Sequence, residues 1–140
     1  MTNLLKRGDT YEEIYRNFKW NIPLDYNIAD DVCDRWAGDP ERLALIYEDK
    51  TKKVHRYTFQ QIHHYANQWA NTLRGLGLGR GDRVTALLAQ DPECAITHVA
   101  CWKAGMVSCP TSVLFGADAL IYRLNDSRAR VLITDSANFS

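Results

Sequence analysis

Cys94, His98 and Cys101 are residue types that commonly bind transition metals, and they lie close together in the sequence. In a helix, positions i, i+4 and i+7 share one face, so two thiolates and an imidazole could converge on a zinc ion. The same spacing is typical of a helix face packed on a core, where cysteine behaves as a small apolar residue. No fourth ligand is spaced to complete a tetrahedral site. We therefore expect no metal site here.

Alternating glycines form a second candidate, because glycine-rich loops bind phosphate groups. Gly75, Gly77, Gly79 and Gly81 occupy every second position. This spacing differs from the G-x-G-x-x-G motif. The run also follows a predicted helix and precedes a predicted strand, which reverses the phosphate-binding arrangement. We interpret these glycines as turn residues, with Gly75 as the left-handed residue that ends the helix.

The remaining histidines do not indicate a catalytic site. His63 and His64 are neighbours on a predicted helix and point in different directions, while His55 lies on a predicted hairpin. A solvated position or one at the rim of the core explains each of them better than catalysis does.

The segment Thr111 to Gly116 has features of a ligand-binding loop. It leaves the C-terminal end of a predicted strand and enters a helix that we expect to begin near Asp118. Loops at this edge of a parallel sheet bring backbone amides and a helix N-terminus towards anionic ligands. Gln90 and Asp91 follow the preceding strand and belong to the same rim. An ordinary connection capped by Asp118 fits the residues equally well, so both interpretations stay open.

A hairpin and a well-capped helix precede this rim. Residues 43–48 and 54–57 read as paired strands, with a solvated, lysine-rich tip between them. Thr58 and Gln61 form a capping box that fixes the start of the next helix. Apolar residues with a period near 3.6 then predict its buried face: Phe59, Ile62, Ala66, Trp69, Ala70 and Leu73.

Strands and helices alternate after this helix, which predicts an α/β fold with a parallel βαβαβ layer. The strands are residues 83–88, 106–109 and 130–134, and the helix between the first two begins at Asp91. The last strand is apolar on both faces, and no later strand in the sequence covers it. We therefore expect the front piece of a larger α/β protein, with an open sheet edge that favours self-association.

Composition excludes several classes of partner. The 140 residues carry 17 Lys plus Arg and 17 Asp plus Glu, without a long run of like charge, so neither nucleic acid nor an anionic membrane is an expected partner. The N-terminus has no apolar stretch of the length that a signal peptide or membrane span requires. The four cysteines form no C-x-x-C pair, which favours free thiols in the reducing cytoplasm.

Several motifs together resemble the front of the AMP-forming acyl-CoA synthetases, and their order and spacing match across most of the chain. The lead, with Phe18-Lys19-Trp20 and Asp34-Arg35-Trp36-Ala37, is similar to that of the short- and medium-chain fatty acid members. The other motifs are Gly81-Asp82-Arg83-Val84, Asp91-Pro92-Glu93, Lys103-Ala104-Gly105, Phe115-Gly116-x-Asp118-Ala119-Leu120 and Val131-Leu132-Ile133-Thr134-Asp135.

The resemblance implies a ligase of fatty acid metabolism that uses ATP, Mg²⁺ and CoA to activate a short- or medium-chain carboxylic acid. The residue pattern separates a lead over residues 1–40, and the resemblance makes residues 41–140 the first part of an adenylate-forming domain. The resemblance also places Leu114, Phe115 and Gly116 near the nucleotide part of CoA. Position 117 is Ala, where some relatives have a second glycine.

The family's phosphate loop and its catalytic motifs do not occur in residues 1–140. No catalytic residue is therefore expected in this chain, and the chain alone is expected to be inactive. A stand-alone, non-catalytic α/β binding or scaffold module is the alternative interpretation. The sequence leaves the identity of the acid open.

Overall fold

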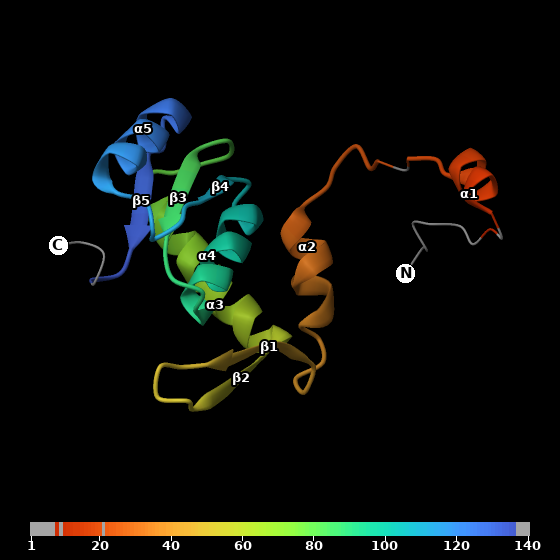
Figure 1. Ribbon diagram of the computed structural model, residues 1–140. Coiled ribbons are helices and arrows are strands. Elements are labelled where there is room, and N and C mark those ends of the chain that lie inside the picture. The colour runs from red at the N-terminus through yellow and green to blue at the C-terminus, as the bar shows by residue number, and fades with distance from the viewer. Residues whose placement is uncertain (1–7, 9, 21, 137–140) are drawn as a thin grey trace.

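A parallel sheet, a separate hairpin and a pair of packed helices make up most of the molecule (Figure 1). The structure is a computed structural model that describes residue 8, residues 10–20 and residues 22–136, so the lead before Gly8 lies outside the described residues. The helices are α1 Tyr11–Asn17, α2 Ile28–Val32, the 3-10 helix η1 Asp34–Trp36, α3 Phe59–Gly75, α4 Pro92–Lys103 and α5 Ala117–Ser127. The strands are β1 Leu43–Glu48, β2 Val54–Thr58, β3 Arg83–Leu87, β4 Val107–Pro110 and β5 Val131–Thr134.

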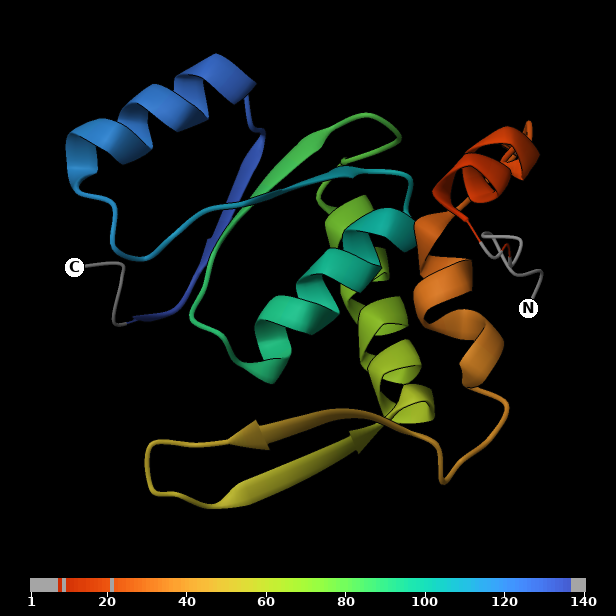
Figure 2. The same cartoon turned by 45° about the vertical axis from the view of Figure 1, so that its right-hand side comes forward.

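The predicted parallel sheet is confirmed, with strand order β4-β3-β5. The chain passes from β4 across β3 to β5. Because such crossovers are right-handed, this order places α4 and α5 on opposite faces of the sheet, as Figure 2 shows. Both β4 and β5 are edge strands among the described residues, whereas the sequence indicated only the last strand as an open edge.

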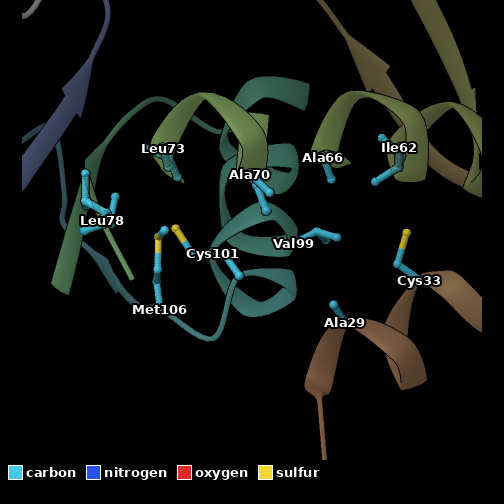
Figure 3. Close-up of a cluster of buried hydrophobic side chains, with 13 residues drawn as sticks. Ala29, Cys33, Ile62, Ala66, Ala70, Leu73, Leu78, Val99, Cys101 and Met106 are labelled. Atoms are coloured by element: carbon cyan, nitrogen blue, oxygen red, sulfur yellow. The ribbon is translucent and has the colours of Figure 1, made fainter. Parts of the chain in front are cut away.

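The core lies where α3 packs along α4 (Figure 3). The Thr58–Gln61 capping box is present as predicted and fixes the start of α3. Most of the predicted α3 face is buried, while Phe59 and Trp69 are half-buried at its border. Small side chains such as Ala66 and Ala100, both fully buried, let the two helices approach closely.

The second half of the lead packs on this helix pair through Ala29 and Cys33. Ile28, Val32 and Trp36 have the four-residue spacing that is typical of one apolar helix face, but Ile28 and Val32 are both more than 40% exposed. Ala29 and Cys33 are buried instead, and Figure 3 shows them directed towards α3 and α4. The helix is also broken between Val32 and Asp34, so Trp36 lies in η1 and does not continue the face of Ile28 and Val32.

The end of α3 differs from the prediction by two residues. Gly75 is the last helical residue, and Gly77 has the left-handed conformation with a φ of +81°. The amide of Gly77 donates to the carbonyl of Arg74 at 2.9 Å, and that of Leu78 donates to Leu73 at 3.2 Å. These bonds form a Schellman motif, which brings buried Leu78 back to Leu73.

The predicted hairpin is confirmed as the antiparallel pair β1 and β2, which forms its own sheet beside the start of α3. Its lysine-rich tip is exposed, and Lys52 pairs with Glu48 at 3.0 Å. At the other end, the guanidinium carbon of Arg42 lies 3.9 Å from the centre of the Trp36 ring. The hairpin is thereby connected to the lead.

Candidate functional site

The loop from Thr111 to Gly116 leaves the sheet at the end where the predicted rim lies. The Thr111 amide donates to the carbonyl of Ala86 at 2.9 Å, which extends the pairing of β4 with β3 by one residue. The Leu114 amide then donates to the Ser112 hydroxyl at 3.2 Å, and the chain turns into α5. The loop after β3 leaves the sheet at the same end (Figure 2).

The start of α5 corrects the predicted cap. Asp118 was expected near the N-cap, but the N-cap is Gly116, and no side chain accepts a hydrogen bond there. Asp118 lies in the first turn instead, because the helix begins one residue earlier, at Ala117. The first amides of α5 are therefore not capped by a side chain and lie next to the loop.

The three predicted contact residues lie together on the outside of this turn. Leu114 is 90% exposed, Phe115 is 39% exposed, and the guanidinium carbon of Arg123 stands 4.0 Å from the centre of the Phe115 ring. A β-carbon built on Gly116 would meet no atom within 4 Å. The surface formed by these three residues is therefore open to a ligand. The contact of Leu114, Phe115 and Gly116 with CoA stays a prediction.

The structure uses Asp91 as the N-cap of α4, as predicted, with its carboxylate accepting from the Cys94 amide at 3.1 Å. This carboxylate is therefore engaged in holding the helix. Gln90 is exposed on the same loop. Of the rim residues after β3, only Gln90 presents a side chain that takes no part in capping.

Cys94 and His98 come together, but Cys101 does not join them. The Cys94 sulfur lies 3.5 Å from Nε2 of His98, whose Nδ1 lies 2.6 Å from the hydroxyl of Ser108. Cys101 is fully buried in the core, where burial raises the pKa of its thiol to about 11. Within the described ranges, no three His, Cys, Asp or Glu side chains are grouped to hold a metal ion.

A polar cluster that the sequence did not reveal joins the lead to the helix pair. The Asp34 carboxylate accepts hydrogen bonds from Lys103 and from Nδ1 of His63, the latter at 2.9 Å. The amide of Asn67 lies 2.9 Å from Nε2 of the same histidine. Asp34 and Lys103 are 69 residues apart, so neither spacing nor periodicity could have paired them.

The electrostatics of this cluster favour its charged form. Burial acts to raise the pKa of Asp34, but the hydrogen bonds and charges of Lys103 and His63 outweigh it, so the pKa is lowered. The Lys103 side chain is only 9% exposed. A shallow cavity of about 430 Å³ adjoins the cluster. It is lined by Asn27, Asp30, Asp34, Asn67, Ala70, Asn71, Arg74 and Lys103.

No helix in the described part of the chain is long and apolar enough to cross a membrane. Many of the exposed large apolar side chains lie on the lead and around α5. The six most exposed among the described residues are Leu24, Leu114, Ile22, Trp20, Tyr11 and Tyr15.

Comparisons with known proteins agree on one family. The family model described as "AMP-binding enzyme" matches residues 33–140. The mitochondrial acyl-coenzyme A synthetase ACSM3 of Rattus norvegicus is 33% identical over 96% of this chain, and the acetyl-coenzyme A synthetase of Pasteurella multocida is 36% identical over 86% of it. The chain spans 24% and 18% of the length of these two relatives.

A solved structure with a similar fold is the crystal structure of the Brucella canis acyl-CoA synthetase. It matches 93% of this chain with a TM-score of 0.86 and 27% sequence identity, and the match covers 26% of that protein. The sequence and fold comparisons therefore point to the same kind of protein over the same residues.

Proposed function

The chain belongs to the AMP-binding enzyme family, and we propose that it forms the N-terminal part of an AMP-forming acyl-CoA synthetase. The observation that carries the proposal is the agreement of sequence and fold with acyl-CoA synthetases along nearly the whole chain. The parallel sheet with a loop and a helix N-terminus at one end is an arrangement in which α/β enzymes bind ligands. The proposal thus has support from the geometry as well.

The proposed reaction has two steps. A carboxylate of the substrate attacks the α-phosphorus of ATP, which forms an acyl-adenylate and releases pyrophosphate. The CoA thiol then attacks the acyl carbon, the thioester forms, and AMP leaves. Magnesium would neutralise phosphate charge in the first step. We assign no described residue to magnesium, because the described part holds no group of ligands for a metal ion.

The contribution of this chain to the reaction would be to bind CoA. We place the nucleotide part of CoA against Leu114, Phe115 and Gly116. Exposed apolar side chains suit contact with an adenine ring, and the amides of the first turn of α5 suit a phosphate group. The absence of a side chain at Gly116 leaves room for the ligand to approach the backbone.

The proposed substrate is a short- or medium-chain carboxylic acid, and the test is made on the complete gene product. The protein is incubated with ATP, magnesium, CoA and, in turn, carboxylic acids from acetate to octanoate, and acyl-CoA is measured by mass spectrometry. We expect acyl-CoA together with stoichiometric AMP. A reaction without CoA serves as control, because it should still exchange pyrophosphate into ATP. Formation of ADP, or of no thioester with any acid, contradicts the proposal.

A stand-alone binding or scaffold module is the second candidate. The observation that favours it is that β4 and β5 are edge strands in the part of the chain that the structure describes, with Leu132 38% exposed on β5. Backbone groups at such an edge can pair with another chain, so we propose self-association through β5.

We also propose that the protein works in the cytoplasm, because its four cysteines are unpaired. A fluorescent fusion in living cells tests this location.

A further inference from the structure

Cys94, His98 and Ser108 form a row of interacting side chains where α4 lies against β4. The thiol lies 3.5 Å from Nε2 of the imidazole, and the imidazole Nδ1 lies 2.6 Å from the hydroxyl. All three side chains are half-buried, so small reagents can reach the row. None of the three belongs to the proposed CoA contact.

One tautomer of His98 makes the row suited to proton transfer. When Nδ1 carries the proton, the imidazole donates to the Ser108 oxygen, and the lone pair of Nε2 faces the Cys94 thiol. Burial lowers the pKa of His98, which keeps the ring neutral near pH 7 and able to accept a proton. The ring also stacks on Trp102, with centroids 6.0 Å apart, which restrains its orientation.

The other three cysteines lack such a base. Cys33 and Cys101 are almost fully buried, and burial raises the pKa of each thiol to about 11. Cys109 is half-buried on β4, where its sulfur lies 3.9 Å from the carbonyl oxygen of Val107. Cys94 alone among the four has an imidazole nitrogen within reach of its sulfur.

The position of Cys94 on α4 affects the pKa of its thiol in two opposite ways. Burial and the Asp91 carboxylate raise this pKa, so little of the thiol is present as thiolate near pH 7. The N-terminal turn of α4, in which Cys94 lies, has the opposite effect and favours a thiolate. Across the interface, His98 meets the neutral hydroxyl of Ser108. Because little thiolate is present, Cys94 can react as a nucleophile only if a neighbouring base removes the thiol proton during the attack.

We propose that Cys94 is a site of thiol–disulfide exchange with low-molecular-weight disulfides, and that His98 acts as its general base. The Cys94 proton moves to Nε2 of His98 while Sγ attacks one sulfur of the disulfide. The sulfur–sulfur bond of the reagent breaks, and its leaving thiolate takes the proton from His98. The disulfide is the oxidant, and the products are a mixed disulfide on Cys94 and one free thiol.

The test measures how fast each cysteine of the purified chain reacts with dithiodipyridine, an uncharged disulfide, using mass spectrometry of peptides to separate the four sites. Cys94 should react first. Its rate should be nearly constant from about pH 7 to about pH 8.5, because a neutral imidazole is present throughout this interval. A thiol without a base would react about 30-fold faster at the upper end, in proportion to its thiolate.

Variants identify the base. His98→Gln should slow labelling of Cys94 by about tenfold or more at about pH 7. The matched control is His64→Gln on the exposed side of α3, which should leave the rate unchanged. Ser108→Ala should also slow Cys94, and it provides a second variant if His98→Gln does not fold. A rate for Cys109 above that for Cys94, a thiolate-like pH profile at Cys94, or equal rates in the histidine variants overturns the proposal.

The natural reagent class is tested with oxidised glutathione. Incubation of the unmodified chain should give a single mixed disulfide at Cys94, and a reducing thiol should restore the free cysteine. Adducts spread evenly over the cysteines contradict the assignment.

Discussion

Lys103 at the end of α4 donates a hydrogen bond to Asp34 in the lead, 69 residues earlier in the chain. His63 of α3 donates to the same carboxylate at 2.9 Å. The lead, α3 and α4, which are distant in sequence, thus come together at the carboxylate of Asp34. The second half of the lead is therefore part of the folded body, in contrast to α1, which buries no residue.

Loss of the Lys103 charge should destabilise the fold. In Lys103→Met, the partly buried Asp34 carboxylate loses its cationic partner, which should cost about 1–3 kcal/mol of unfolding free energy. Urea unfolding followed by circular dichroism measures this change. The control is Lys52→Met. The Lys52 side chain is 83% exposed in a surface pair, so its loss should change stability by less than about 0.5 kcal/mol. Equal losses of unfolding free energy in the two variants would show that the Asp34–Lys103 pair contributes no more to stability than a surface ion pair does.

Acid should weaken the same contact. The pKa of Asp34 is lowered below its usual 3.8 because Lys103 and His63 outweigh the effect of burial. The unfolded chain therefore binds the proton more readily than the folded one. The stabilisation is complete above about pH 5 and disappears as the pH falls through 3.8 towards the lowered value. The stability advantage of the unmodified chain over Asp34→Asn, measured by urea unfolding, should narrow between about pH 7 and about pH 3. If the stability difference between the unmodified chain and Asp34→Asn increased in acid, the pKa of Asp34 would be raised by folding, and the prediction would be wrong.

The α3 and lead segments show what the sequence could predict. The capping box of Thr58 and Gln61 depends on residues three positions apart, so the start of α3 was predicted correctly. The end of α3 depends on Leu78 packing back on Leu73, and the sequence therefore indicated the wrong glycine, Gly75. The Asp34 cluster depends wholly on how the lead packs against two helices, which no local pattern encodes.

The loop before α5 should affect the second half-reaction of the complete enzyme. Phe115→Ala or Gly116→Asp should raise the KM for CoA about fivefold, which corresponds to about 1 kcal/mol of lost binding free energy. Pyrophosphate exchange should be nearly unchanged, because adenylation does not involve CoA. The control is Ile121→Ala, an exposed residue of α5 outside the loop. Equal losses in both half-reactions would assign a structural role to the loop.

The 140-residue chain by itself should not exchange pyrophosphate into ATP with any short or medium carboxylate. The sequence has no segment resembling the family's phosphate loop, so the charge that develops on the transferring phosphoryl group would lack its stabilising contacts. Radiolabelled pyrophosphate provides a sensitive assay. Exchange above the buffer background with purified chain would refute this prediction.

The open edge of β5 should make the isolated chain self-associate. Leu132 is 38% exposed on this edge strand, so Leu132→Lys should reduce association by placing a charge there. Size-exclusion chromatography with light scattering gives the mass of each species. Ile121→Lys serves as the control, because it adds the same charge on the exposed surface of α5. A monomeric chain with a sharp cooperative melt would argue against pairing at β5.

The rim shows a second limit of sequence-based prediction. The loop and the following helix were predicted at the correct place, because Gly116 and the apolar residues of α5 mark them locally. The sequence did not indicate that Gly116, rather than Asp118, would be the N-cap residue of α5. The row of Cys94, His98 and Ser108 was also hidden, because Ser108 belongs to a strand whose position depends on the whole sheet.

The strand order β4-β3-β5 has a consequence for synthesis on the ribosome. The central strand β3 is made first, and its second neighbour is complete only when residue 134 has been added, about 50 residues later. At ordinary translation rates, this delay lasts about 3–10 seconds. During that time α3 and α4 can already pair, because both helices are complete once residue 103 has been added. The nascent chain must therefore protect β3, its most deeply buried strand, from other partners until both neighbours have emerged.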